Sequence, residues 1–589
     1  MIRRSIVRTT VLLTVLFALV PSSNAQPSAC PFTVTGTSRS ATIDAVVLAR
    51  YALRVTGPAL YAGVAPNTPA LANAATLIAA NAERLDLDGD GAFTPTDAII
   101  ILRYLVGFTE DRWLGGLLVA SNAKRKLPSE IRDYMNAGCP APPASSFTTY
   151  FVATDGNNTS GDGTLAKPWK TISFGIGKLT GGDTLVVKPG TYVGLENFIM
   201  NVPSGTAARP TRVFAQQPME VRIQSNNSLN YYDNQLRVSG NYVDVDGFIF
   251  DMAGTLSPPH IADIEGNFNK ITRSIFKRSG NIDAYGGWLY VGGSDNLIED
   301  VAGVGACRYC FGQGGPYALT KRNIWRRIVG RFDYSNASLP KMTMNTYGNY
   351  VGDGVSSHLH QNVIAIDGND VDTGRVNAEF KYASFGAGKA STNVTYYGAI
   401  ALNDHAAYAG IYASVNGSDN KVVNSIVWDV RGSSTAKNGI QFDQAGTVIE
   451  RVTIGGVRLS NYVKSGDPGE LTPPPPNSAL GGTHANLLLN APGAVVLKQY
   501  GVSGTRWGEP GYDQLTNVDL WPWPYQDKIK AVFRETNDVP SPRLNNLPTS
   551  NNTKRGFAAD GNGLYGGPIT LTSYIWEYLG TPCPPSACP

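Results

Sequence analysis

A short pattern of alternating apolar and polar residues recurs along the middle of the chain and predicts a stack of similar β-coils. Clear copies read NKITRSIF from Asn269, NLIEDVAGV from Asn296, NIWRRIVG from Asn323 and NKVVNSIVW from Asn420. Further copies begin at Asn241, Asn362, Asn393 and Thr447. The regular spacing is about 27 residues, which is typical of a solenoid and shorter than the units of a propeller. Alternate apolar side chains of such coils fill one continuous core, so the pattern predicts a parallel β-helix.

Asparagine at a fixed place in each copy has a structural explanation. Asparagine tolerates left-handed backbone, and its side chain can bond along the stack. We therefore expect these residues to support the coils and look elsewhere for a functional site.

The spacing lengthens between Asn323 and Asn393, where extra residues should form loops on a binding face. In this region His358 and His360 flank Leu359, and with Leu359 inward both imidazoles would point outward. The candidate catalytic residues are His358, His360, Asp353, Lys381, Asp404 and His405.

Three interpretations of this group remain open. It could be a metal-assisted site, with Asp353 or Asp404 adding ligands to the histidines. It could be a general acid–base site for cleaving a polysaccharide, with Lys381 or a nearby arginine facing the uronate carboxylate, and paired carboxylates for glycoside hydrolysis are also available. The third interpretation is two exposed histidines on a sheet face. Tyr290 and Tyr412 alternate with apolar neighbours, and we expect outward rings that can stack on sugars.

The N-terminal residues differ from the repeats. Arg3, Arg4 and Arg8 precede an apolar run and the small residues Ser23-Asn24-Ala25. This order predicts a secretory signal peptide cleaved after Ala25. The apolar run is shorter than the ~20 residues that span a bilayer, and no other stretch is long enough, so we expect no membrane span.

An acidic loop, DLDGDGAFTPTD, begins at Asp86. Its carboxylates stand at loop positions 1, 3, 5 and 12 with glycine at position 6, which is the spacing of an EF-hand calcium loop. The expected Ca²⁺ ligands are Asp86, Asp88, Asp90, the backbone carbonyl of Ala92, and Asp97.

This loop and the apolar helix after it resemble dockerin type I repeats, which carry aspartate at the last loop position. An earlier copy, Thr33 to Asp44, has threonine where three carboxylates would stand, so we expect one occupied site. The resemblance implies a cohesin-type partner. The degenerate copy weakens that implication and leaves an intramolecular cap or attachment module as the alternative.

Charge and cysteines restrict the class of protein. The formal net charge is +3 and falls to about zero without the three signal-peptide arginines, which argues against non-specific nucleic-acid binding. The six cysteines are an even number, as expected for disulfides in a secreted chain. We expect the pairs Cys30–Cys139, Cys583–Cys588 and Cys307–Cys310, the last having also a metal or redox spacing.

The stretch TYFVATDGNN from Thr149, followed by GGDTLVVKPGTY from Gly181, resembles the opening of secreted bacterial right-handed parallel β-helix proteins of the pectate-lyase-like superfamily. The resemblance implies a helical cap and first coil, but no particular reaction, because this superfamily includes lyases, hydrolases, epimerases and non-catalytic surface proteins. The C-terminal region is similar to the tails of such proteins. Its apolar residues should cover the open end of the last coil, and they include Trp521, Trp523, Ile575, Trp576 and Leu579.

The expected fold is mainly β, a right-handed parallel β-helix solenoid preceded by a small α-helical, calcium-binding, dockerin-like module. The expected boundaries are 1–25 signal peptide, 26–139 module, 140–148 Pro/Ser linker, 149–465 β-helix, and 466–589 last coil and C-terminal cap. We expect a secreted protein, extracellular or at the cell surface, that acts on or binds extracellular polysaccharide, with a polysaccharide lyase as the enzyme class. The alternative is a non-catalytic surface or matrix protein, such as an adhesin or a glycan-binding scaffold.

Overall fold

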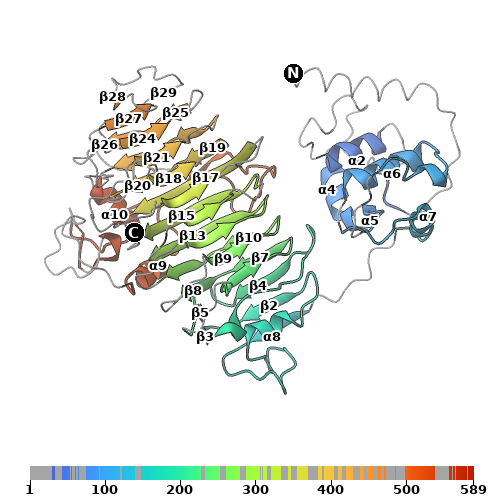
Figure 1. Ribbon diagram of the computed structural model, residues 1–589, viewed down its shortest axis with the longest axis horizontal. Helices are drawn as coiled ribbons and strands as arrows, with labels where there is room; N and C mark the ends of the chain where they lie inside the picture. The colour runs from blue at the N-terminus through green and yellow to red at the C-terminus, as the bar shows by residue number, and fades with distance from the viewer. Residues whose placement is uncertain are drawn as a thin grey trace. The chain divides into compact units, whose positions relative to one another are not determined.

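A computed structural model shows two compact units, residues 1–147 with 206–209 and residues 148–205 with 210–589 (Figure 1). The structure describes residues 30–33, 43–53, 55, 60, 64, 74–91, 93–117, 119, 123–139, 148–226, 233–252, 260–278, 287–305, 307, 309–314, 320–332, 342–346, 355–368, 383–387, 391–403, 409–413, 419–428, 438–442, 448–455, 461–465, 470–471, 484–485, 498–536, 556–559, 561–563, 565–579 and 582–588. None of the helices in these ranges is both long and apolar enough to cross a bilayer.

The first unit is helical. Its helices are α2 (Asp44–Ala52), α4 (Ala74–Ala80), α5 (Ala82–Leu85), α6 (Pro95–Leu105), η3 (Glu110–Arg112) and α7 (Pro128–Asn136). Helix α6 begins with proline in its first turn, and the carboxylate of Asp97 accepts the backbone N–H and the hydroxyl of Thr94, both at 2.8 Å. The buried Ile100 and Ile101 of α6 share a core with Val47 and Leu48 of α2. The predicted Cys30–Cys139 disulfide is present and joins the two ends of this core.

The second unit is a stack of coils whose strands form three parallel ladders (Figure 1). The first ladder contains β1 (Thr149–Val152), β2 (Thr184–Val187), β4 (Thr211–Ala215), β7 (Val243–Asp246), β10 (Lys270–Thr272), β13 (Leu297–Gly305), β15 (Ile324–Phe332), β17 (Val355–Ile366), β19 (Thr392–Tyr397), β22 (Lys421–Val423), β25 (Val448–Glu450) and β29 (His484–Ala485).

The second ladder contains β3 (Gly190–Val193), β5 (Val221–Gln224), β8 (Phe248–Met252), β11 (Ile275–Arg278), the later halves of β13, β15 and β17, and then β20 (Ile400–Leu402), β23 (Ile426–Trp428) and β26 (Thr453–Gly455). The third ladder contains β6 (Leu236–Val238), β9 (His260–Ile264), β12 (Gly287–Val291), β14 (Tyr309–Gln313), β16 (Met342–Thr346), β18 (Ala383–Ala387), β21 (Ala409–Ala413), β24 (Asn438–Phe442) and β27 (Asn461–Ser465), with β28 (Glu470–Leu471) antiparallel at its end. This arrangement confirms the predicted mainly β solenoid, whereas its right-handed winding stays a prediction.

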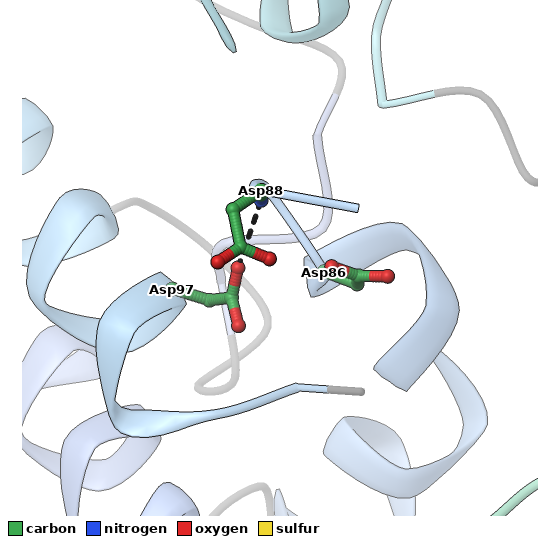
Figure 2. A group of neighbouring side chains, drawn as sticks. All are labelled: Asp86, Asp88 and Asp97. Atoms are coloured by element: carbon green, nitrogen blue, oxygen red, sulfur yellow. Dashed lines mark hydrogen bonds between the residues drawn. The ribbon is translucent and has the colours of Figure 1, made fainter. Parts of the chain in front are cut away.

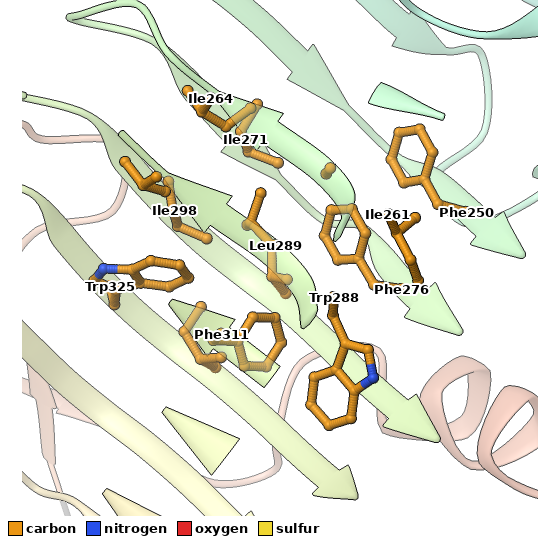
Figure 3. Packing of buried hydrophobic residues seen from close by; sticks show 14 of the residues in the cluster. Phe250, Ile261, Ile264, Ile271, Phe276, Trp288, Leu289, Ile298, Phe311 and Trp325 are labelled. Carbon is orange, nitrogen blue, oxygen red and sulfur yellow. The ribbon is translucent and has the colours of Figure 1, made fainter. Parts of the chain in front are cut away.

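The core runs through the middle of the stack. Helix α8 (Ile172–Ile176) lies against the first coils, beside β2 (Figure 1), and the short η4 (Leu195–Asn197) contacts α8. Inward side chains from successive coils stack on one another, as Figure 3 shows. The rings of Phe250 and Phe276, one coil apart, are nearly parallel with centroids 5.0 Å apart, and Trp288 meets Phe311 edge-on at 5.0 Å.

A column of buried side chains joins the coils at the corner before the first ladder. The side-chain oxygen of Asn296 accepts the backbone N–H of Asn269 at 2.8 Å, and that of Asn323 accepts the N–H of Asn296 at 2.9 Å. On the next coil the acceptor is Nδ1 of His358, 3.2 Å from the N of Asn323. Each acceptor satisfies a buried backbone donor at the corner, where an unpaired group would cost free energy. The predicted bonding of asparagine along the stack is confirmed.

The predicted alignment of the copies is wrong at one place, and the predicted left-handed asparagines are confirmed only in part. Strand pairing sets Leu359 beside Ile324, so His358 stands on the rung after Asn323, and Asn362 belongs to the next corner. The left-handed backbone falls on the residue before Asn269, Asn296 and Asn323, for example on Phe268 with φ 59°. Asn362 and Asn393 are themselves left-handed, with φ 53° and 58°, as predicted. Asparagine stands at both corners of these coils, and only the strand pairing shows which copies correspond.

The chain after the last described coil covers the outer face of the second ladder. This cap comprises α9 (Gln526–Phe533), η5 (Gly556–Ala558) and α10 (Leu571–Tyr578). Outward residues of the second ladder, such as Ile275 and Ile400, lie in one apolar cluster with Trp521, Trp523 and Ile575. The same cluster holds Trp576 and Leu579. These residues therefore bury the outer apolar face of the second ladder, and the expectation that they cover the open end of the last coil is wrong.

An arm, residues 498–519, lies on the outer face of the first ladder. It contains the antiparallel pair β30 (Lys498–Tyr500) and β31 (Leu515–Asp519). Arg326, fully buried in β15, donates to the carbonyl of Val502 at 2.7 Å and to Glu299 at 3.1 Å, and the N–H of Gly504 donates to Glu299 at 2.9 Å. Side chains of the arm also pack on Leu359. The arm thus completes the hydrogen bonds of charged groups that the first ladder presents outward.

The β unit contains the other two predicted disulfides, Cys307–Cys310 beside β14 and Cys583–Cys588 after α10. With Cys30–Cys139 they pair all six cysteines of the chain.

The buried ladder should contribute measurably to stability. Replacing Asn296 with alanine leaves the buried N–H of Asn269 without its acceptor, so the free energy of unfolding should fall by about 1–3 kcal/mol. The matched control is Asn241→Ala, which removes an acceptor from an exposed corner and should cost clearly less. Chemical denaturation measures both. Equal losses would contradict the role of the buried column.

Candidate functional site

The predicted histidine pair lies in the core. His358 and His360 are both 0% exposed. The ring of His360 stacks on Tyr396 with centroids 4.6 Å apart, and Nε2 of His358 lies 3.4 Å from the hydroxyl of Thr320. The predicted outward orientation is wrong because Leu359, between them, faces outward under the arm.

Burial also changes the proton affinity of both imidazoles. Desolvation lowers the pKa of His358 to about 3 and that of His360 well below its ordinary value. Both rings are therefore neutral at physiological pH. The other predicted catalytic residues, Asp353, Lys381, Asp404 and His405, lie outside the described residues.

The outer face of the third ladder carries a polar and aromatic cluster. The arm and cap contacts described above fall on the first and second ladders, whereas the third ladder presents partly exposed side chains. Strand pairing places Arg237, Asp263 and Tyr290 side by side on β6, β9 and β12. His260, at the start of β9, lies on the same face because its ring stacks on Tyr290, with centroids 4.9 Å apart and planes 12° from parallel.

Neighbouring polar groups hold these rings in place. Nδ1 of His260 lies 2.8 Å from Oδ1 of Asp263. This is a close electrostatic contact, since that oxygen accepts no hydrogen bond in the described structure. The other carboxylate oxygen accepts the side-chain N–H of Asn234 at 2.9 Å. The hydroxyl of Tyr290 donates to the carbonyl of Gly314, and burial raises the pKa of Tyr290 to about 12, so this hydroxyl stays protonated.

An ion pair borders the cluster. Arg237 lies 2.8 Å from Glu265, whose other oxygen accepts the hydroxyl of Ser239 at 2.6 Å. The side chains of Arg237 and Glu265 are 44% and 42% exposed, and those of His260 and Asp263 are 20% and 19% exposed, so a ligand can reach the ion pair and part of the His260 and Asp263 side chains. The group offers an aromatic ring, an imidazole and paired charges on one flat sheet face, which suits recognition of a polar ligand with apolar faces.

Sequence reasoning missed most of this cluster. It expected the ring of Tyr290 to face outward, but it gave no role to His260, Asp263, Arg237 or Asn234. One signal was available in the sequence, because Asp263 and Tyr290 each stand just before the last apolar residue of their strands, Ile264 and Val291. The structure pairs Asp263 with Tyr290 and Ile264 with Val291. Aligning strands instead of asparagines would have brought the two together.

The acidic loop of the helical unit gathers three buried carboxylates (Figure 2). Asp86, Asp88 and Asp97 each offer an oxygen, and these oxygens lie within 4.8 Å of one another. Asp86 accepts the N–H groups of Gly89 and Gly91 at 2.7 and 2.9 Å. Asp97 accepts the N–H of Asp88 at 3.0 Å, the bond drawn in Figure 2.

This loop has more buried negative charge than its hydrogen bonds compensate. Oδ2 of Asp88 is buried and has no hydrogen-bond partner. Burial raises the pKa of Asp86 to about 6 and that of Asp97 to about 7. A hard divalent cation fits these oxygen donors and supplies the missing positive charge. Of the other predicted ligands, Asp90 lies in the described loop and Ala92 outside the described residues.

Comparisons with known proteins give structural neighbours only. A scan against protein-family models finds no match, and a search of curated proteins finds none. Similar solved structures include the pectate lyase Pel9A, with 18% identity over 52% of this chain and 77% of that chain and a TM-score of 0.33. The PL6 family polysaccharide lyase Pedsa3628 from Pseudopedobacter saltans has 14% identity, coverages of 54% and 91%, and a TM-score of 0.31. An alginate lyase from Paenibacillus sp. str. FPU-7 has 10% identity, coverages of 54% and 97%, and a TM-score of 0.36.

The buried histidines should make the fold sensitive to acid. Histidine in the unfolded chain has a pKa near 6.5, whereas folded His358 has a pKa of about 3. Between these two pH values the unfolded chain binds a proton at His358 that the folded protein does not, so acid favours unfolding. Stability should fall by about 1.4 kcal/mol per pH unit over this interval for each such histidine. His358→Asn keeps a ladder acceptor without titrating, so its melting temperature should fall less than that of the wild type between pH 7 and pH 4. If the melting temperatures of the two proteins fall equally with acid, the buried, neutral state of His358 is contradicted. The melting temperatures between pH 7 and pH 8.5 serve as the baseline.

Proposed function

We propose that this protein is a secreted polysaccharide-binding protein and that its binding surface is the outer face of the third ladder around Tyr290. The observation that carries the proposal is the stacked pair of Tyr290 and His260, partly exposed and bordered by oriented polar groups. Sugars present both C–H faces and hydroxyl groups, and an aromatic ring beside hydrogen-bonding side chains complements both.

The shape and order of this surface support a polymer as the ligand. Neighbouring positions of a parallel ladder are about 4.8 Å apart, so the face offers a regular series of contacts along the stack. Asn234 holds the carboxylate of Asp263, Ser239 holds that of Glu265, and the carbonyl of Gly314 accepts the hydroxyl of Tyr290. This prior order lowers the entropy lost on binding.

We propose binding rather than cleavage. The two histidines expected to supply acid and base, His358 and His360, are enclosed in the core and neutral. A general acid or base must come within hydrogen-bond reach of its substrate, and these positions do not meet that requirement.

Secretion is supported by two features. The sequence of residues 1–25, which lie outside the described residues, has the order of a signal peptide. The three disulfides, Cys30–Cys139, Cys307–Cys310 and Cys583–Cys588, are typical of oxidising compartments outside the cytosol.

We also propose that the acidic loop of the helical unit binds one Ca²⁺. Asp86, Asp88 and Asp97 would hold it, together with Asp90 and the carbonyl of Ala92. The dockerin-like sequence has one acidic loop where a full repeat pair has two. We therefore propose that the ion stabilises this unit, and binding of a cohesin-type partner is the alternative role.

Polysaccharide binding should depend on Tyr290. In affinity electrophoresis or calorimetry with a panel of neutral and uronate polymers, Tyr290→Ala should bind about two- to thirteenfold more weakly than the wild type, because a stacked ring contributes roughly 0.5–1.5 kcal/mol. Tyr565→Ala, at a tyrosine that is 48% exposed in the cap, is the matched control and should bind normally. Absence of binding to every polymer would refute the proposal, and release of unsaturated products would show cleavage instead.

Calcium should stabilise the helical unit. Added Ca²⁺ should raise its melting temperature, and chelation should reverse the effect, because the ion compensates carboxylates that are buried without it. Asp88→Ala combined with Asp90→Ala should abolish this shift. Asp111→Ala, at an exposed acidic residue of the same unit, should retain it. A wild-type melting temperature that is equal with and without Ca²⁺ would rule out the calcium site.

A further inference from the structure

The acidic loop of the helical unit is held from outside by residues 123–139, which we call the closing segment. We infer that Arg125 of this segment positions the loop for Ca²⁺ and that the Cys30–Cys139 disulfide controls how tightly the ion binds. This inference rests on the proposed calcium site and adds to it a positioning residue and a redox condition.

Arg125 binds the backbone of the first half of the loop. Its backbone N–H donates to the carbonyl of Asp88 at 2.8 Å, and its Nε donates to the carbonyl of Leu87 at 2.7 Å. The same guanidinium donates to the carbonyl of Asp86. Three successive carbonyl groups of the loop therefore point towards one residue of the closing segment.

The same peptide groups are also bound on their opposite side. The N–H groups of Leu87 and Asp88 donate to Oδ1 of Asp97 at 2.7 and 3.0 Å. Because C=O and N–H point in opposite directions in a trans peptide group, Arg125 and Asp97 together fix the backbone between the first two carboxylates. A metal site whose backbone is already ordered loses less entropy when the ion binds.

Arg125 is itself held in place on two sides. Its Cζ lies 3.8 Å from the ring centroid of Tyr134 in α7, in a cation–π contact. A Cβ atom at Gly89, in the turn of the loop, would stand only 3.1 Å from the same Cζ. The guanidinium thus fits closely between the loop and α7, and it depends on the position of this helix.

The end of the closing segment is fixed by a disulfide and by the helix that leads into the loop. The carbonyl groups of Gly138 and Cys139 accept the guanidinium of Arg84 at 3.0 and 2.9 Å. Arg84 belongs to α5 and stands two residues before the loop. Cys139 is bonded to Cys30, and both residues are buried. The disulfide therefore anchors the segment that holds Arg125 against the loop.

Reduction of this disulfide should loosen the calcium site. A dithiol reductant breaks the S–S bond, gives one hydrogen to each sulfur, and is itself oxidised to a disulfide. The released end of the closing segment gains conformational freedom, which Ca²⁺ binding must then remove. Coupling between two equilibria is reciprocal, so bound Ca²⁺ should also protect Cys30–Cys139 against reduction. The loop reaches its full affinity in an oxidising compartment, where disulfides persist.

Calorimetric titration of the full-length protein with Ca²⁺ tests the role of Arg125. Arg125→Gln should weaken binding by about tenfold or more, which is the usual effect of removing an outer hydrogen-bonding partner of a metal site. Arg125→Lys should weaken binding as well, because an ammonium group lacks the planar fork of a guanidinium. The matched control is Arg132→Gln, at an arginine of α7 whose side chain is 44% exposed, and it should bind normally.

Charge alone would have the opposite effect, since a cation beside the site repels Ca²⁺. Tighter or unchanged Ca²⁺ binding by Arg125→Gln would therefore overturn the positioning role.

The disulfide is tested in both directions of the coupling. Cys30→Ser combined with Cys139→Ser should weaken Ca²⁺ binding severalfold, whereas the control pair Cys583→Ser and Cys588→Ser should leave it unchanged. In the wild type, Ca²⁺ should slow the reduction of Cys30–Cys139 by dithiothreitol severalfold, as measured by alkylation and mass spectrometry. Equal reduction rates with and without Ca²⁺ would overturn the coupling.

These outcomes separate the inference from the calcium site on which it rests. Absence of Ca²⁺ binding by the wild type would overturn the proposed calcium site itself. Binding of Ca²⁺ by the wild type and equally by the Arg125 and cysteine variants would overturn only the role of the closing segment.

Discussion

Hydrogen bonds between buried side chains and the backbone of the neighbouring coil hold this solenoid in register. Asn269, Asn296, Asn323 and Asn420 supply oxygen acceptors, and His358 supplies a ring nitrogen at the same corner. A slip of one residue in any strand would turn its core side chains outward. Because the column fixes the corner from coil to coil, it also fixes which residues each of the three faces presents to its surroundings.

The three faces then acquire different roles from their outward residues. The second ladder presents isoleucine and valine, and the cap buries them. The first ladder presents charged groups such as Arg326 and Glu299, and the arm completes their hydrogen bonds. The third ladder presents Tyr290, His260 and paired charges that remain partly exposed. We therefore place the proposed binding surface on this last face, since the arm covers the first ladder around Arg326 and the cap covers the apolar side chains of the second ladder.

Local patterns predicted much of the architecture. Residues close together in sequence predicted the repeat, the stacking of asparagine and the grouping of Asp86, Asp88 and Asp97. The even number of cysteines predicted the disulfides. The errors concern pairing between distant segments. His358 looked like an exposed catalytic residue because Leu359 was placed inward, and only the arm, more than a hundred residues later, makes an outward leucine stable. The cluster around His260 was missed for the same reason, because it forms between strands of different coils.

Hydrogen–deuterium exchange with mass spectrometry tests the central claim most directly. The full-length protein is compared with and without an oligosaccharide of a polymer that it binds. Binding on the third ladder predicts slower exchange in peptides covering β9 and β12, with the arm and the cap unchanged. Slower exchange confined to the arm, the cap or the helical unit, with β9 and β12 unchanged, would contradict this account.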